Sequence, residues 1–177
     1  MFILKSYKNY VFSAMFAALV LMATMFIQVP SINGYVHIGD SIVYLAAAFL
    51  PMPFSILAAG LGAALADAMT PYIVYAPFTF VIKGLMAACF WSKSEKILSK
   101  RNIIALPIAG IINIAGYALT EFIILSVNRE AVSAAFATSL ATVYGNLIQS
   151  ITASVIFVIV ALALDKMNFK KALEKIQ

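Results

Sequence analysis

Six long apolar segments, separated by short polar or basic stretches, account for most of the chain. Of its 177 residues, 64% are hydrophobic and 11% are charged, whereas soluble domains are roughly 45–50% apolar. A membrane span needs about 20 mainly apolar residues, and it forms a helix because its backbone hydrogen bonds must be satisfied internally. The sequence therefore predicts an all-α integral membrane protein that forms a single domain over residues 1–177. The six expected transmembrane helices cover residues 9–29, 39–50, 53–70, 77–92, 102–126 and 138–164.

The basic residues are distributed unevenly around these segments. If the N-terminus is cytoplasmic, ten of the twelve Lys and Arg residues fall on the cytoplasmic side, while Arg129 lies outside and Lys83 lies within the membrane. The positive-inside rule selects this orientation, which makes both termini cytoplasmic in a multi-pass protein of the cell membrane. Orientation and attraction to anionic membrane lipid explain the basic clusters, so we expect no nucleic-acid partner.

The stretch from Gly34 to Cys89 carries three formally charged residues in sequence apolar enough for a bilayer: Asp40, Asp67 and Lys83. A charge at the centre of a lone membrane helix costs about 3 kcal/mol, so such residues usually face a protein interior or a wet cavity. Asp67 and Lys83 either pair with each other or contact a ligand. Asp40 either favours the helix N-terminus or contacts a ligand. All three are candidate substrate-binding residues.

The expected topology places further polar residues at a similar depth in the outer half of the membrane. Lys83 lies six residues after Pro77, a descent of roughly 9 Å at the helical rise. Glu121 lies near the outer end of the fifth span, and Asn146 and Gln149 lie about two to three turns below the start of the sixth. Residues three or four apart share a helix face. We therefore expect these residues to line one pocket that opens on the outer side.

Two outer connections contain further candidates. Residues 30–38, PSINGYVHI, combine an Asn33-Gly34 turn signal with His37 in an apolar loop, which predicts either a lid over a ligand or a tight connection. Tyr75 is a candidate for stacking on a flat ligand. An interfacial aromatic belt is the alternative, and we favour it for the nearby Tyr72. Glu121 has Tyr117, four residues earlier, as its expected local partner.

The balance of charges and the missing motifs restrict the function. Three carboxyls face one ammonium in the expected pocket, which favours a neutral or weakly basic ligand over an anion. The chain has no phosphate-binding Gly-Lys-Ser/Thr loop and no Gly-x-Ser-x-Gly elbow. One His and one Cys exclude a His/Cys metal cluster. We therefore expect no enzymatic activity, no cofactor and no metal.

Small residues predict close helix contacts in two places. Ala14 and Ala18 form a small-xxx-small pair in the first span, and Gly60 and Gly62 lie in the third. Side chains this small let two membrane helices approach closely.

The middle third of the chain resembles the substrate-binding S components of energy-coupling factor (ECF) vitamin transporters. The resemblance is carried by GYVHIGDSIVYLAAAF, by GLGAALADAMTPYIVYAPFTFVIKGLMA, by the six apolar segments and by the Ala14–Ala18 pair. It is strongest to the branch assigned to hydroxymethylpyrimidine or pyridoxine, with the riboflavin branch as an alternative. Asp40, Asp67 and Lys83 match the motif positions, whereas Glu121 rests on the depth argument.

The resemblance implies a subunit of a prokaryotic plasma-membrane importer that binds a small-molecule vitamin at the outer side. Its partners would be a transmembrane coupling subunit, the T component, and two cytoplasmic ATPases. The Ala14–Ala18 pair would contact the coupling subunit. Two other classes stay open: a structural or assembly membrane protein without a ligand, and a stand-alone proton-coupled carrier.

Overall fold

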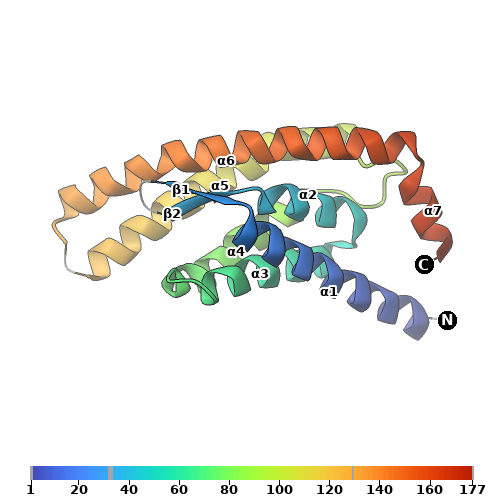
Figure 1. Cartoon of the computed structure of the whole chain (residues 1–177), viewed down its shortest axis with the longest axis horizontal. Helices are drawn as coiled ribbons and strands as arrows, with labels where there is room; N and C mark the ends of the chain where they lie inside the picture. The colour runs from blue at the N-terminus through green and yellow to red at the C-terminus, as the bar shows by residue number, and fades with distance from the viewer. Residues whose placement is uncertain (1, 32–33, 129, 177) are drawn as a thin grey trace.

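The computed structural model of the chain describes residues 2–31, 34–128 and 130–176, and it is mostly helical (Figure 1). Asn33 of the predicted turn and Arg129 of the predicted outer side lie outside the described residues. In chain order the elements are α1 (Phe2–Phe26), β1 (Gln28–Ser31), β2 (Gly34–His37), α2 (Gly39–Phe49), α3 (Met52–Ala68), the 3-10 helix η1 (Ile73–Tyr75), α4 (Ala76–Ala88), α5 (Lys100–Val127), α6 (Val132–Lys166) and α7 (Phe169–Ile176). The predicted helical character is confirmed, and the β-hairpin and α7 are additions that the sequence analysis did not predict.

The helices differ in length more than six equal spans would. Among the described residues, Tyr7–Phe26 of α1, together with α5 and α6, are long and apolar enough to cross a membrane. At 1.5 Å per residue, the 28 residues of α5 and the 35 of α6 extend roughly 42 Å and 52 Å. By contrast, α2, α3 and α4 have 11, 17 and 13 residues. Among the residues that the structure describes, three long apolar helices are thus combined with three shorter apolar ones, α2, α3 and α4.

Proline and the hairpin decide where the first helices end. Leu50 has an extended backbone, with φ −92° and ψ 146°, because Pro51 follows it, and α3 then begins with proline in its first turn. The first helix was expected to reach residue 29, but α1 ends at Phe26 because the chain extends into β1. The strands β1 and β2 are antiparallel, with Val29 opposite Val36.

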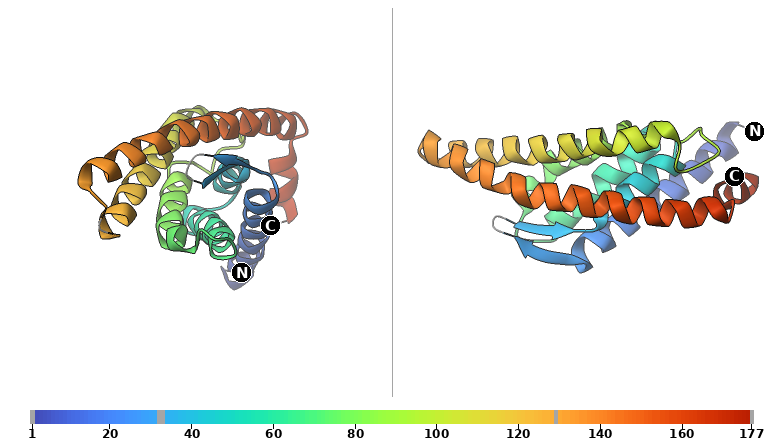
Figure 2. Two further views of the ribbon diagram at one scale, coloured as in Figure 1. Left: turned by 60° about the vertical axis from the view of Figure 1, so that its left-hand side comes forward. Right: turned by 90° about the horizontal axis from the view of Figure 1, so that it is seen from above.

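The two ends of the molecule hold different parts of the chain. Both termini and the connection between α4 and α5 lie at one end, and the turn between α5 and α6 projects at the other (Figures 1 and 2). The β-hairpin lies against the half of the molecule that is remote from the termini. This placement matches the predicted topology, in which both termini share one side.

The packing is inverted relative to a soluble protein, with small residues inside and large apolar residues outside. Leu57, Leu61 and Leu65 of α3 are between 40% and 49% exposed, whereas Ala58, Ala59 and Ala66 are fully buried. A lipid-facing surface explains this arrangement, since membrane helices pack through small residues. The predicted glycine contacts form as well: a Cβ on Gly62 would lie 2.5 Å from the backbone oxygen of Ala17 in α1.

The apolar core lies toward the end that holds the termini. Tyr44 of α2 stacks on Phe90 with ring centres 5.0 Å apart, and Phe157 of α6 contacts Phe90 edge-on at 5.7 Å. Tyr44 and Phe157 are fully buried. Along α2 and α6, this core is followed first by buried polar residues and then by a pocket.

Candidate functional site

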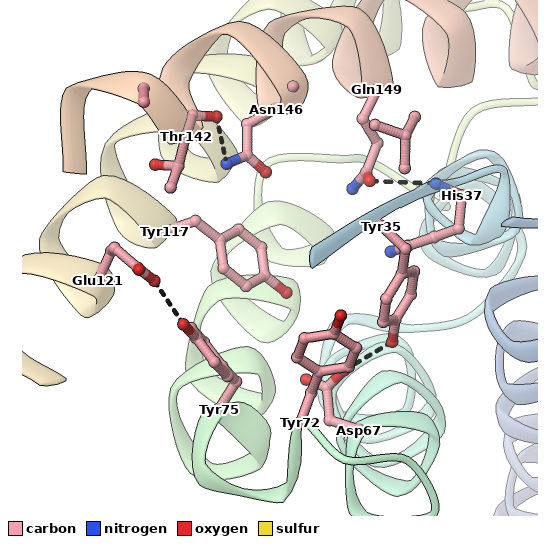
Figure 3. A pocket seen from close by; sticks show the side chains of 13 residues that line it. Tyr35, His37, Asp67, Tyr72, Tyr75, Tyr117, Glu121, Thr142, Asn146 and Gln149 are labelled. Atoms are coloured by element: carbon pink, nitrogen blue, oxygen red, sulfur yellow. Dashed lines mark hydrogen bonds between the residues drawn. The ribbon is translucent and has the colours of Figure 1, made fainter. Parts of the chain in front are cut away.

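A pocket lies in the half of the molecule remote from the termini, between the β-hairpin, the α3–α4 connection and the helices α5 and α6 (Figure 3). Its volume of about 90 Å³ exceeds several times the roughly 10–15 Å³ that one water needs. The pocket is partly open to its surroundings. Its lining comprises Tyr35, Val36, His37, Asp67, Tyr72, Tyr75, Tyr117, Glu121, Ala141, Thr142, Gly145, Asn146 and Gln149.

Four rings follow one another along one wall, and we name them the aromatic row: His37, Tyr35, Tyr72 and Tyr75. The ring centres of Tyr35 lie 5.5 Å from His37 and 5.2 Å from Tyr72, and Tyr72 lies 6.2 Å from Tyr75. Strand β2 supplies the first two rings, because residues two apart on a strand point to the same face. Such a row offers π-faces to a flat ligand.

The opposite wall is polar and is built by α6, where Thr142, Asn146 and Gln149 follow helical spacing and form what we name the polar stripe. The Asn146 side-chain nitrogen donates to the backbone oxygen of Thr142 at 3.0 Å. The amide oxygen of Asn146 consequently points toward the pocket (Figure 3). The polar stripe thus presents amide groups across from the aromatic row.

Two carboxyls of the pocket accept hydrogen bonds from tyrosines. The Tyr35 hydroxyl donates to Asp67 Oδ1 at 2.8 Å, and the Tyr75 hydroxyl donates to Glu121 Oε2. Burial, and then the nearby Asp67 carboxyl, raise the pKa of Tyr35 above its usual range, so this phenol stays protonated and remains a donor. These tyrosines tie the hairpin and the α3–α4 connection to the pocket walls.

The hairpin is fixed to the helices at its second strand. The His37 backbone N–H donates to Gln149 Oε1 at 3.2 Å, and the Gly39 N–H donates to His37 Nδ1 at 3.1 Å. Any Cβ on Gly39 would lie 2.1 Å from Thr24 Oγ1 of α1, so only glycine fits there. Burial lowers the pKa of His37 to about 4, with Asp40 opposing and Lys83 adding to the shift, so His37 is neutral at pH 7.

Beneath the pocket lies a set of buried polar residues that we name the ion-pair layer: Asp40, Lys83, Asn113, Gln149 and Ser150. Lys83 Nζ lies 2.7 Å from Asp40 Oδ1, and both side chains are fully buried. The same ammonium donates to Asn113 Oδ1 at 2.8 Å, and Asn113 Nδ2 donates to Ser150 Oγ at 3.2 Å. Gln149 Nε2 donates to Asp40 Oδ2 at 2.8 Å. The layer joins α2, α4, α5 and α6.

Six of the eight predicted substrate-binding residues line this pocket: His37, Asp67, Tyr75, Glu121, Asn146 and Gln149. Asp40 and Lys83 do not line it, because they pair with each other below it. Of the two alternatives left open for Asp67 and Lys83, the structure does not show the pairing of these residues with each other, and Asp67 lines the pocket. Asp40 lies in the first turn of α2, but the helix has no side-chain cap, and the buried ammonium is its main partner.

The predicted partner of Glu121 and the predicted position of Tyr72 also differ in the structure. Glu121 bonds to Tyr75, whereas its expected partner Tyr117 exchanges a hydrogen bond with Thr79 at 3.0 Å. Tyr72, for which an interfacial belt was favoured, lines the pocket instead. Tyr35 was not predicted as a site residue. The period of two between Tyr35 and His37 would have indicated it if residues 34–37 had been predicted as a strand.

Other predicted features lie away from the pocket. Ala14 and Ala18 are exposed on α1, on a face that is open to another helix. Among the described residues, no group of three or more His, Cys, Asp and Glu side chains is placed to hold a metal ion.

One family model and one solved structure match most of this chain. The model of the family described as "ECF-type riboflavin transporter, S component" matches residues 4–166. The solved structure reported under "Structure and mechanism of the S component of a bacterial ECF transporter" is similar, with a TM-score of 0.70 and 18% identity over 92% of this chain and 98% of that one. An uncharacterized protein in the gap 3'region of Pyrococcus woesei is 29% identical over 99 residues, 55% of this chain and 66% of its own length, just under two thirds.

Proposed function

The chain belongs to the family of S components of ECF-type riboflavin transporters, and from this premise we propose that it captures riboflavin for an ATP-driven importer. It is a multi-pass protein of the cell membrane and a binding subunit, not an enzyme. The hydroxymethylpyrimidine or pyridoxine branch, which the sequence analysis favoured, is replaced in this proposal by its stated alternative, because the matching family model is the riboflavin one.

The observation that carries the proposal is the pairing of the aromatic row with the polar stripe across one pocket. Riboflavin has a flat tricyclic ring with carbonyl and N–H groups on one edge and a hydroxylated chain on the other side. Tyrosine faces suit the ring, and the amides of the polar stripe suit the polar edge. A ligand of this size is larger than the enclosed 90 Å³ and would extend through the open side of the pocket.

The charges of the pocket favour a neutral ligand. Asp67 and Glu121 line it, whereas Lys83 lies below and is engaged by Asp40. Riboflavin is uncharged at neutral pH, but its phosphate ester is an anion that would meet these carboxyls. We therefore propose that the site takes the free vitamin in preference to the phosphate ester.

We propose that the whole chain, residues 1–177, acts as one binding domain with both termini in the cytoplasm. Lys93, Lys96 and Arg101 lie in or next to the α4–α5 connection, at the same end as the termini, which supports this orientation by the positive-inside rule. The pocket then opens outward. The partners of the chain would be the T component, which it would contact through the exposed Ala14 and Ala18, and two ATPases that supply the energy.

A titration of the purified chain tests the substrate. Stacking on tyrosine quenches flavin fluorescence, so riboflavin binding is measured directly, with its phosphate ester, hydroxymethylpyrimidine and pyridoxine as competitors. We expect submicromolar binding of riboflavin and weaker binding of the other three. Preferential binding of hydroxymethylpyrimidine or pyridoxine would assign the chain to that branch instead. Failure to bind any of these ligands would favour a structural or assembly role.

A pull-down with co-expressed T component and ATPases tests the partner surface. Ala18→Trp places a bulky ring on the exposed face of α1 and should reduce recovery of the partners while sparing riboflavin binding. The matched control is Ile159→Trp on α6, where the native side chain is 61% exposed. Equal recovery of partners by both variants would place the coupling surface elsewhere.

A further inference from the structure

The side-chain amide of Gln149 is held in one orientation by two contacts of opposite sense. Its nitrogen donates to Asp40 Oδ2 at 2.8 Å, and its oxygen accepts from the His37 backbone N–H at 3.2 Å. A flipped amide would bring oxygen against a carboxylate and nitrogen against an N–H. Both of these contacts would be repulsive, so the amide has one orientation.

Asp40 imposes this orientation because it has no freedom of its own. Lys83 Nζ lies 2.7 Å from its other oxygen, and neither side chain is exposed. Lys83 is in turn held by Asn113, which donates to Ser150. A carboxylate fixed in this way is an acceptor only, and it accepts from the amide nitrogen.

The two contacts leave Gln149 with one N–H and one oxygen lone pair, and this residue lines the pocket. A primary amide with one donor and one acceptor side by side complements an adjacent carbonyl and N–H. The pyrimidine-dione edge of an isoalloxazine ring, C2=O, N3–H and C4=O, presents this pair. Hydroxyl groups of a sugar-like chain present no such fixed pair.

We propose that Gln149 reads the N3–H and an adjacent carbonyl of the flavin ring, and that Asp40, fixed by Lys83, is the residue that positions the Gln149 amide for this task. The inference rests on the proposed riboflavin function. It gives Asp40 and Lys83 an indirect role in substrate recognition, through Gln149, in place of the direct contact that the sequence suggested.

The probe is 3-methylriboflavin, in which a methyl group replaces the N3 hydrogen while the rest of the ring is kept. The wild-type chain should bind riboflavin at least about tenfold more tightly than this analogue, since one hydrogen bond is lost and the methyl group clashes. Gln149→Leu removes the amide that is proposed to hydrogen-bond to the flavin ring, so the preference of this variant for riboflavin over 3-methylriboflavin should fall below about threefold. Tyr144→Phe on the same helix is the control, because Tyr144 is 67% exposed and does not line the pocket.

The double variant Asp40→Leu/Lys83→Met separates positioning from support of the fold. Replacing a buried ion pair by apolar residues of similar size is often neutral for stability, so its melting temperature should stay close to that of the wild type. Its preference for riboflavin over 3-methylriboflavin should nevertheless fall as in Gln149→Leu. The absorption bands of bound riboflavin, which shift with hydrogen bonding at the ring carbonyls, should change in the same two variants and not in Tyr144→Phe.

These measurements test three claims separately: recognition of the flavin edge by Gln149, positioning of Gln149 by Asp40, and riboflavin binding itself. If the wild type binds riboflavin but does not discriminate against the analogue, or if Gln149→Leu still discriminates, Gln149 does not read this edge. If the folded double variant discriminates like the wild type, Asp40 does not position Gln149. Should the double variant fail to fold, Asp40→Asn/Lys83→Met takes its place, because it keeps the shape of the Asp40 side chain, leaves no unpaired buried charge and no longer dictates the amide orientation. A wild type that binds no riboflavin would contradict the proposed function itself.

Discussion

The ion-pair layer and the pocket above it contain similar polar side chains but satisfy them differently. In the layer, the Asp40 carboxylate faces the Lys83 ammonium at 2.7 Å, and amides occupy the remaining positions. In the pocket, the carboxyls of Asp67 and Glu121 accept hydrogen bonds from neutral tyrosine hydroxyls. The layer therefore balances its charges within the protein, whereas the pocket keeps an excess of acceptors for a ligand.

This difference predicts that the two regions respond differently to substitution. Changes in the layer should affect stability first, because an unpaired buried charge is costly. Changes in the pocket should affect ligand affinity with little effect on stability.

Lys83→Met should have the largest effect, because it leaves the Asp40 carboxylate buried without its cation. We expect a loss of about 3–5 kcal/mol in the free energy of unfolding in detergent. Lys171→Met is the matched control, since Lys171 pairs with Glu95 at 3.1 Å on the surface, where the two side chains are 54% and 79% exposed. Equal stability of the two variants would show that the layer does not hold the helices together.

His37 predicts a pH dependence of stability. Its pKa is lowered from 6.5 to about 4 in the folded chain, so below pH 6.5 the unfolded chain binds a proton that the folded chain does not. This contribution to stability is complete above pH 6.5 and is lost as the pH falls toward 4, by up to about 3 kcal/mol. Melting curves of wild type and His37→Gln at pH 7 and pH 4.5 should diverge, with the variant less sensitive to acid. Parallel curves would contradict the burial of a neutral imidazole here.

Asn146→Ala should weaken riboflavin binding by about tenfold through the loss of one hydrogen-bonding group, while the melting temperature stays close to that of the wild type. Glu121→Ala should act in the same direction. Fluorescence titration and thermal unfolding on the same samples give both quantities. If both variants bind like the wild type, the ligand lies elsewhere.

Tyr35→Phe should have the smallest effect, because it removes a single hydroxyl that donates to Asp67 and keeps the ring in the aromatic row. We expect riboflavin affinity to fall about threefold to tenfold. Tyr35→Ala, which also removes the ring, should cost more. Identical affinities for the two variants would show that the ring makes no contribution to binding.

Hydropathy and charge placement predicted the helical membrane fold and the depth of the polar residues. Both predictions were possible because the length of an apolar segment and the cost of burying a charge can be evaluated from each segment of the sequence by itself. Depth alone did not tell which side of a helix faces the pocket. Lys83 and Asp67 were predicted to lie at similar depths, yet Lys83 contacts Asp40 instead. This contact depends on how α2 packs against α4, which hydropathy and charge do not predict. The β-hairpin was missed because its strands have only four residues each and because β1 contains Pro30.

Packing also explains why Tyr35 and Tyr72 were not predicted as site residues. For Tyr72 an interfacial belt was the favoured interpretation, and Tyr35 lies in a segment that was predicted as a loop. The position of both rings depends on how the hairpin packs against α3 and α6. By contrast, Asn146 and Gln149 were predicted correctly as neighbours on one face, because helical spacing fixes their relative direction.

A structure of the chain with riboflavin bound tests the central claim most directly. The flavin ring should lie between the aromatic row and the polar stripe, with its pyrimidine-dione edge at Gln149, while Asp40 and Lys83 remain paired beneath it. A flavin bound at the end that holds the termini, or a pocket that stays without ligand while riboflavin occupies another surface, would contradict the account.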